Sequence, residues 1–157
     1  MTAAISTTGT IRQATVEDLP DLAPLAEEFY ASTEALKDFH IDRFVQLWTT
    51  LLGNGTGAIF LLDQDGEIIG TIAGVVYPEQ YSPTLICQEF YLYIKKERRG
   101  GFGLLKLIRT FERWGKLMGC SQIRIGHLQD LQPVELGNLY QCLGYKPIEV
   151  NYAKELR

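Results

Sequence analysis

A cluster of basic residues and glycines, KKERRGGFG at positions 95–103, lies between two apolar segments. The segment before it, EFYLYI, is typical of a strand, and the periodic segment after it, LLKLIRTFERWGKLM, is typical of a helix. Clustered glycines cost backbone entropy and clustered positive charges repel one another, so this arrangement does not favour stability. It suits the binding of an anion instead.

The chemistry follows from the start of the expected helix, which presents unpaired N–H groups and the positive end of the helix dipole. Gly100, Gly101 and Gly103 can adopt a positive φ and let a diphosphate approach the backbone, while Arg98 and Arg99 add positive charge. The alternative is a flexible turn with solvated charges. The cluster has neither the Lys-Ser/Thr pair of a Walker loop nor the glycine spacing of a Rossmann turn.

Composition limits the class of protein that must position this cluster. The 157 residues suffice for one domain over 1–157 with a core of ordinary size. A net charge of -4 argues against a broadly basic nucleic-acid-binding domain. Three cysteines without CxxC spacing fit a reduced, cytoplasmic compartment, and we expect neither a signal peptide nor a membrane span.

The apolar pattern predicts a mixed α/β domain in the order β-α-α-β-β-β-α-β-α-β. After a strand at 10–13, Thr15 and Asp18 form a variant of a capping box at the start of a helix, and a second helix spans 38–52. The predicted buried positions of these helices are Leu19, Leu22, Ala23, Ala26, Phe29 and Tyr30, then Ile41, Phe44, Val45, Trp48, Leu51 and Leu52.

The middle of the chain predicts a hairpin, with strands at 58–63 and 67–77 closed by Asp65-Gly66. The second of these strands is apolar on both faces, which indicates a central strand covered by helices on both sides. The strand at 85–94 leads into the next strand by a parallel crossover. The remaining predicted elements are a helix at 101–118, a strand at 121–127, a helix at 133–144 with Gly144 as its C-cap, and an extended segment at 145–156.

Arg98, Gly101 and Gly103 form the pattern R-x-x-G-x-G, which resembles the pyrophosphate-binding motif of the GNAT superfamily of N-acetyltransferases. The resemblance extends to the opening IRQATVEDLPDL, the strand EFYLY, the long helix and the closing NLYQCLGYKPIEV. It implies a central mixed, mostly antiparallel β-sheet flanked by helices, with a V-shaped splay between the two middle strands. It also implies transfer of an acetyl group from acetyl-CoA, a co-substrate, to an amine without a metal.

In this family acetyl-CoA lies in the splay between the strand EFYLYI and the later strand SQIRIGH. The resemblance implies that the backbone of Tyr91, Leu92 and Tyr93 binds the pantetheine arm and the thioester carbonyl, where a fixed N–H stabilises developing negative charge. The diphosphate would lie on backbone N–H groups. The candidate residues for it are Arg98, Arg99, Gly100, Gly101, Phe102, Gly103 and Leu104.

An alkylamine is almost wholly protonated at pH 7, so a base or a water chain must accept its proton before attack. Glu89 is the candidate base, because spermidine/spermine-type members of the family resemble this chain in carrying a Glu nine residues before the motif arginine. Glu89 also shares strand parity with Tyr91 and Tyr93. The alternative is a carboxylate that faces solvent at a sheet edge.

Tyr140 matches the tyrosine that many relatives use as the general acid for the leaving thiolate, although its helical spacing also suits a core position. Many relatives have Asn seven residues before this tyrosine, where this chain has Pro133. Asn138 or Gln132 would then substitute as the contact to the cofactor arm.

The expected acceptor is a primary amine of a small molecule or of a peptide or protein. Its pocket would involve the segment at 31–40, where Glu34 and Asp38 hint at a cationic amine. His40 and His127 are expected to have ordinary polar roles, since two histidines without ligand spacing do not make a metal site. A homodimer is plausible, no nucleic acid or membrane partner is expected, and the alternative function is a catalytically lapsed CoA-binding sensor or scaffold.

Overall fold

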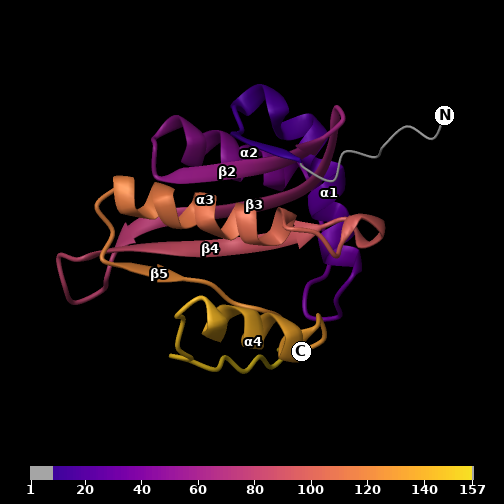
Figure 1. Ribbon diagram of the computed structural model, residues 1–157. Coiled ribbons are helices and arrows are strands. Elements are labelled where there is room, and N and C mark those ends of the chain that lie inside the picture. The colour runs from indigo at the N-terminus through magenta and orange to yellow at the C-terminus, as the bar shows by residue number, and fades with distance from the viewer. Residues whose placement is uncertain (1–8, 157) are drawn as a thin grey trace. The chain divides into compact units, whose positions relative to one another are not determined.

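The computed structural model describes residues 9–156, which divide into two compact units. The first unit ends at Gly126 and contains a β-sheet with three α-helices, and the second begins at His127 and contains one α-helix (Figure 1). The expectation of a single domain over 1–157 stays a prediction.

Five strands form one sheet in the order β1-β2-β3-β4-β5. Neighbours from β1 to β4 are antiparallel, whereas β5 is parallel to β4, as the crossover predicted. The central strand is β3, which confirms the inference from its two apolar faces. The strands are β1 (Thr10–Gln13), β2 (Gly57–Gln64), β3 (Glu67–Pro78), β4 (Leu85–Ile94) and β5 (Gln122–Arg124).

Helices cover both faces of this sheet in the first unit. A Cβ at Gly74 of β3 would lie 2.5 Å from Phe111, so this face packs on α3. The next residue, Val75, faces the other side of the sheet. Val75 pairs with Gly57 of β2, and a Cβ at Gly57 would lie 3.3 Å from Trp48, so this side of the sheet packs on α2. The helical elements of this unit are η1 (Val16–Asp18), α1 (Leu19–Ala31), α2 (Ile41–Gly53), η2 (Lys96–Arg98) and α3 (Gly103–Leu117).

The junction between β1 and the first helical turn confirms the predicted capping box. The backbone N–H of Thr15 donates to the carboxylate of Asp18 at 2.8 Å. Arg12 donates to both oxygens of the same carboxylate at 2.8 Å, and this pairing is the main reason that the pKa of Asp18 falls to about 2. Asp18 therefore joins the edge strand to the start of the helix.

The β2–β3 hairpin has the predicted turn. Asp65 and Gly66 both have positive φ values, of 54° and 83°, as a two-residue type I′ turn requires. The N–H of Gly66 donates to the side chain of Asp63 at 2.9 Å. The turn fixes the register that places β3 in the middle of the sheet.

The predicted buried face of α1 is confirmed for all positions except Tyr30, which is half-buried. In α2 only Phe44 and Trp48 are buried, and the prediction for Ile41 is wrong because its side chain is 50% exposed. The helix begins at Ile41 rather than at 38, since Asp38 has a φ of 58°, outside the right-handed helical region.

Three other boundaries differ from the sequence prediction. Helix α3 begins at Gly103 rather than at 101, because η2 and a short loop occupy the preceding residues. Strand β5 covers 122–124 instead of 121–127, and the segment 145–156 forms no strand. Helix α4 (Pro133–Cys142) of the second unit ends as predicted, with Gly144 at a φ of 93°.

Candidate active site

Strands β4 and β5 separate part of the way along β4. Their parallel pairing covers only Ile86–Gln88 against Gln122–Arg124, whereas β4 stays paired with β3 as far as Ile94. From Glu89 onward, no strand of the described residues pairs with the β5 side of β4. This is the splay that the resemblance implied, although β5 is the last strand of the sheet because 145–156 adds none.

A β-bulge lies in β4 where the splay opens. Glu89 pairs with Gly74 and Tyr91 pairs with Ala73, so Phe90 is an extra residue on β4. Because Gly74 and Ala73 are consecutive, their partners face opposite sides of the sheet. The predicted shared parity of Glu89 and Tyr91 is therefore wrong. Bulges of this kind re-aim side chains and are common beside active sites.

Glu89 has an unusual electrostatic environment at this bulge. Its side chain accepts a hydrogen bond from the N–H of Gly126, just beyond β5, at 3.1 Å. Burial raises the pKa of Glu89 to about 7 because it disfavours the charged carboxylate, and the Gly126 hydrogen bond opposes this only partly. A carboxylate with a pKa of about 7 can accept a proton near neutral pH. A carboxylate that faces solvent has a lower pKa and is a weaker base.

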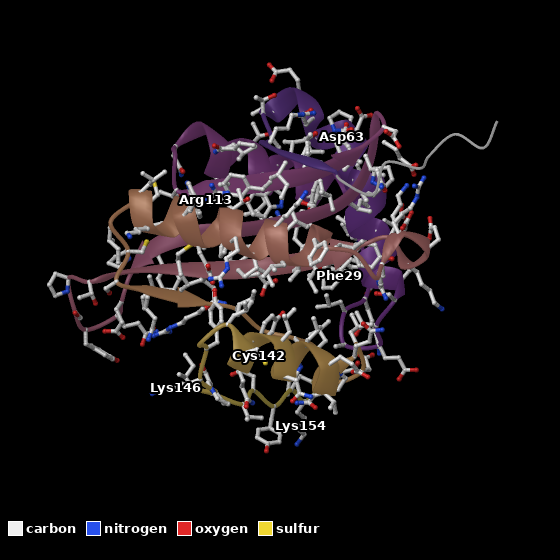
Figure 2. All side chains as sticks on the ribbon, in the orientation of Figure 1. Phe29, Asp63, Arg113, Cys142, Lys146 and Lys154 are labelled. Carbon is white, nitrogen blue, oxygen red and sulfur yellow. The ribbon has the colours of Figure 1, made fainter. Side chains whose placement is uncertain are left out.

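The tyrosines that follow the bulge anchor β4 through their side chains. The ring of Phe29 on α1, which is labelled in Figure 2, lies 5.7 Å from that of Tyr91 and 6.0 Å from that of Tyr93. Burial also raises the pKa of the Tyr91 phenol, while the Thr71 hydroxyl lowers it. Because these two rings are buried among aromatic neighbours, Tyr91 and Tyr93 can offer only their backbone groups to a ligand in the splay.

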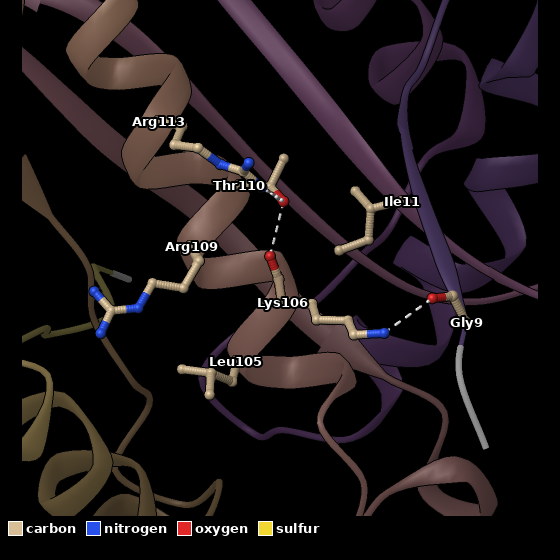
Figure 3. A pocket seen from close by; sticks show the side chains of 7 residues that line it. All are labelled: Gly9, Ile11, Leu105, Lys106, Arg109, Thr110 and Arg113. Atoms are coloured by element: carbon tan, nitrogen blue, oxygen red, sulfur yellow. Dashed lines mark hydrogen bonds between the residues drawn. The ribbon is translucent and has the colours of Figure 1, made fainter.

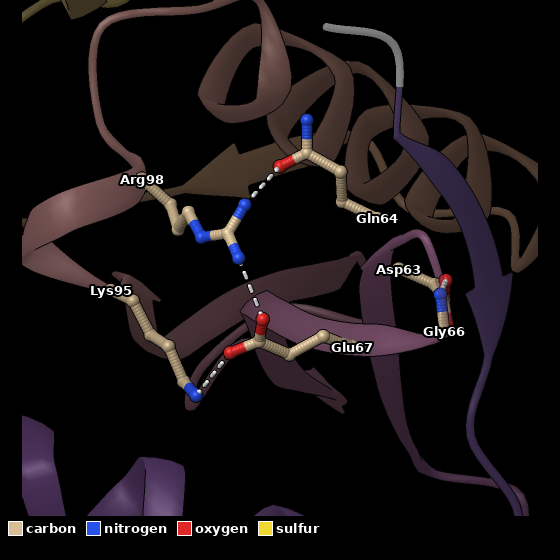
Figure 4. Close-up of polar contacts among 6 residues, drawn as sticks. All are labelled: Asp63, Gln64, Gly66, Glu67, Lys95 and Arg98. Carbon is tan, nitrogen blue, oxygen red and sulfur yellow. Dashed lines mark hydrogen bonds and ion pairs between the residues drawn. The ribbon is translucent and has the colours of Figure 1, made fainter. Parts of the chain in front are cut away.

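Basic side chains of the 95–103 cluster bind the β2–β3 hairpin. Glu67 accepts hydrogen bonds from Lys95 at 2.9 Å and from Arg98 at 2.8 Å, and Arg98 also reaches Gln64 at 3.4 Å (Figure 4). The Glu67 side chain is 44% exposed, so these ion pairs contribute little to stability. They do fix the loop, and they draw the Arg98 charge toward Glu67.

Arg99 is likewise held by its own strand. Its Nε donates to the carbonyl of Ile94 at 2.9 Å, and its guanidinium lies 5.4 Å from the centroid of the Tyr93 ring. The side chains of Arg98 and Arg99 thus both contact other groups of the protein. A bound anion would depend mainly on backbone N–H groups.

The glycines of the cluster have different roles. Only Gly100 has a positive φ, of 103°, and a Cβ at Gly100 or Gly101 would meet nothing within 4 Å. A Cβ at Gly103 would lie 2.5 Å from Leu62, so this glycine permits close packing of α3 on β2. No side chain caps α3, and Phe102 before it is 76% exposed. The first turn of α3 therefore has no side-chain cap, and the binding of an anion there stays a prediction.

The second unit carries the predicted general acid. The ring of Tyr140 on α4 stacks on His127, with centroids 6.3 Å apart, and lies 6.0 Å from Tyr145. Asn138 lies on the same helix, and Pro133 is its first residue. The roles of Tyr140 and Asn138 stay predictions.

Residues 9–156 contain no group of three or more His, Cys, Asp and Glu that could hold a metal ion. None of the helices in this range has the length and apolar character needed to cross a membrane.

The mixed sheet, the splay at Glu89 and the uncapped helix after a glycine loop together resemble the fold of several acetyltransferases. Solved structures show the same fold. A ribosomal-protein-alanine N-acetyltransferase from Brucella melitensis biovar Abortus 2308 is 16% identical, with a TM-score of 0.74 over 96% of this chain and 100% of that one. An aminoglycoside N-acetyltransferase in complex with CoA is 18% identical, with a TM-score of 0.75 over 96% of this chain and 95% of that one.

A solved protein that is named for a different role has a similar fold. A transcriptional regulator from Bacillus halodurans C-125 is 17% identical, with a TM-score of 0.75 over 95% of this chain and 100% of that one. No protein-family model matches the chain, and no curated protein has a similar sequence. At these identities the likeness shows the fold, and the activity must be argued from the site.

Proposed function

We propose that the protein is an acetyl-CoA-dependent N-acetyltransferase that moves an acetyl group to a primary amine by direct attack in a ternary complex. One observation carries this proposal: Glu89, with a pKa of about 7, lies where β4 parts from β5. A base of that strength is of use in a cleft where an amine must lose its proton. The fold shared with N-acetyltransferases agrees with this interpretation.

The residues around the splay fit acetyl-CoA, which would supply the activated acetyl group as a thioester. The β5 side of β4 beyond Gln88 has no strand partner among the described residues, so backbone groups of Tyr91, Leu92 and Tyr93 can bind an extended arm. The space over Gly100 and Gly101 and the uncapped first turn of α3 suit a diphosphate. The side-chain charges of Arg98 and Arg99 would assist only at longer range.

Two residues carry the proton transfers in this proposal. Glu89 accepts the proton of the attacking amine, directly or through water. Tyr140 donates a proton to the leaving thiolate. A backbone N–H of β4 donates to the reacting carbonyl and stabilises the negative charge that develops there.

The acceptor class that we propose is a primary amine of a small molecule, with a peptide or protein amine as the second possibility. Two of the neighbours are named for such acceptors, an aminoglycoside and a ribosomal protein. A homodimer and a cytoplasmic location stay predictions.

Release of free CoA thiol tests the proposal. The purified protein is given acetyl-CoA with a panel of amines, polyamines, amino acids, aminoglycosides and peptides, and the thiol is measured over time. We expect at least one amine to accelerate thiol release, and we expect the Glu89→Gln variant to lose most of that rate. Equal rates for the wild type and this variant would remove Glu89 from the reaction.

The alternative function is a domain that binds CoA without catalysis. Pro133 favours this alternative, because many relatives have an asparagine at its position for the cofactor arm. In addition, one neighbour of the same fold is named a transcriptional regulator. Saturable binding of acetyl-CoA with no thiol release for any amine would support this alternative.

A further inference from the structure

A second basic site lies on α3, away from the β4–β5 splay. A groove of about 550 Å³ separates the start of β1 from one flank of α3 (Figure 3). This volume is within the range of small-molecule sites. The residues that line it are Gly9, Ile11, Leu105, Lys106, Arg109, Thr110 and Arg113.

The position of the groove on the helix separates it from the splay. Successive residues of an α-helix are rotated by about 100°, which places Lys106, Thr110 and Arg113 along one side of α3. Gly115 lies on the other side, where its Cβ would be 2.4 Å from Ile123 of β5. The groove therefore follows the flank of α3 that faces β1, opposite the side of the helix that packs on β5.

The groove collects positive charge that the protein only partly neutralises. Arg109 pairs with Glu112 at 2.9 Å, whereas Lys106 and Arg113 donate to neutral oxygens. Lys106 donates to the carbonyl of Gly9 at 3.3 Å, and Arg113 reaches the Thr110 hydroxyl at only 3.5 Å. Arg109 and Arg113 are exposed, so both can turn toward a ligand.

The region around the groove is rich in positive charge, whereas the chain as a whole has a negative net charge. Residues 95–116 contain eight Lys and Arg against two Glu, although the whole chain has 15 Lys and Arg against 19 Asp and Glu. Part of this excess serves the loop before α3, through the contacts of Lys95 and Arg98 with Glu67. The three cations of the groove take no part in those contacts.

We propose that this groove is a second anion site, which binds a small organic anion of two or more charges, a phosphate ester or a polycarboxylate. Two arginines and a lysine on successive turns supply forked and single donors for such oxygens. Ile11 and Leu105 supply an apolar wall for the carbon skeleton. The site does not depend on the acetyl transfer proposed for the splay.

The test uses the full chain labelled with ¹⁵N and titrated at constant ionic strength with citrate, inorganic phosphate or acetate. We expect saturable amide shifts at Gly9, Ile11 and 106–113 with citrate and phosphate, at a Kd near or below about 1 mM. Acetate, with a single charge, should bind at least tenfold more weakly. Which of the two multivalent probes binds more tightly distinguishes a phosphate site from a polycarboxylate site.

Matched variants make the test specific. Lys106→Gln with Arg113→Gln should weaken citrate binding at least tenfold, whereas Arg43→Gln with Lys146→Gln removes the same charges from exposed positions outside α3 and should not. If the first double variant fails to fold, Thr110→Glu places a negative charge in the groove and should have the same effect. Unsaturable shifts spread over all basic residues, or equal weakening by both double variants, would overturn the proposal.

Binding of acetyl-CoA separates this site from the splay. The rise in Tm that acetyl-CoA causes should persist in the Lys106→Gln, Arg113→Gln variant. Loss of that rise only in this variant would make the groove part of the cofactor site and would also overturn the proposal of a second one.

Discussion

At the scale of single residues, the proposed chemistry depends on Glu89 more than on the basic side chains of the 95–103 cluster. The motif arginines bind Glu67 and the carbonyl of Ile94, whereas burial gives Glu89 a pKa of about 7. The sequence identified Glu89 but for a partly wrong reason, since the bulge at Phe90 breaks the parity on which that inference relied. No residue type in EFYLYI indicates a bulge, so alternation alone could not predict it.

Replacing Glu89 with Gln should lower kcat by about 10² to 10⁴-fold, the usual contribution of a general base. The wild-type rate should rise with pH through about 7, because only the deprotonated carboxylate accepts a proton. Initial rates from pH 5.5 to 9 measure both effects, with the exposed Glu149→Gln as the control. A wild-type rate that does not change with pH across this range would contradict the role of Glu89.

Replacing Tyr140 with Phe should lower turnover and leave acetyl-CoA binding unchanged, because the phenol is proposed to donate a proton only as the thiolate leaves. The matched control is Tyr152→Phe, since the side chain of Tyr152 is 93% exposed. Thiol-release rates measure the first effect and the Tm with acetyl-CoA measures the second. Unchanged turnover would leave Tyr140 as a packing residue against His127.

At the scale of elements, the strand–loop–helix from β4 to α3 carries the binding proposal. Its order and its parallel crossover were predictable, because the apolar runs and glycines mark each boundary. The short helix η2 and the pairing of Arg98 with Glu67 were not, since the partner lies 31 residues earlier on a hairpin. Interactions so distant in sequence have no local signal in a single chain.

Replacing Gly101 with Val should abolish the stabilisation by acetyl-CoA without unfolding the protein. The φ of Gly101 is not in the left-handed region and its Cβ would meet nothing within 4 Å, so the free protein should accept the change. The added methyl groups would occupy the space proposed for the diphosphate. Gly53→Val, at another open glycine, is the control. A full response to acetyl-CoA in the Gly101 variant would place the diphosphate elsewhere.

At the scale of the whole molecule, the described chain has the order of elements that the sequence predicted through β5, with helices on both faces of the sheet. The segment 145–156 forms no strand, because apolar alternation by itself does not supply the partner strand with which a strand must pair. Alternation of apolar and polar residues identifies a candidate strand. Whether a second strand pairs with it depends on the tertiary structure.

Global stability should depend on pH through Glu89. Its pKa in the folded state is raised above the ordinary value near 4.5, so the folded state holds the proton more tightly than the unfolded state. This contribution, up to roughly 3 kcal/mol, is complete below about pH 4.5 and is lost as the pH rises through about 7. Urea unfolding at pH 5 and 8 should show a larger loss for the wild type than for Glu89→Gln, and equal losses would argue against a raised pKa.

The central claim, that the splay and the start of α3 bind acetyl-CoA, is tested most directly by titrating the purified full chain with acetyl-CoA in a calorimeter. We predict saturable heat with one site per chain, absent in Gly101→Val and present in Gly53→Val. No heat up to millimolar acetyl-CoA at two temperatures, or undiminished heat in Gly101→Val, would contradict it.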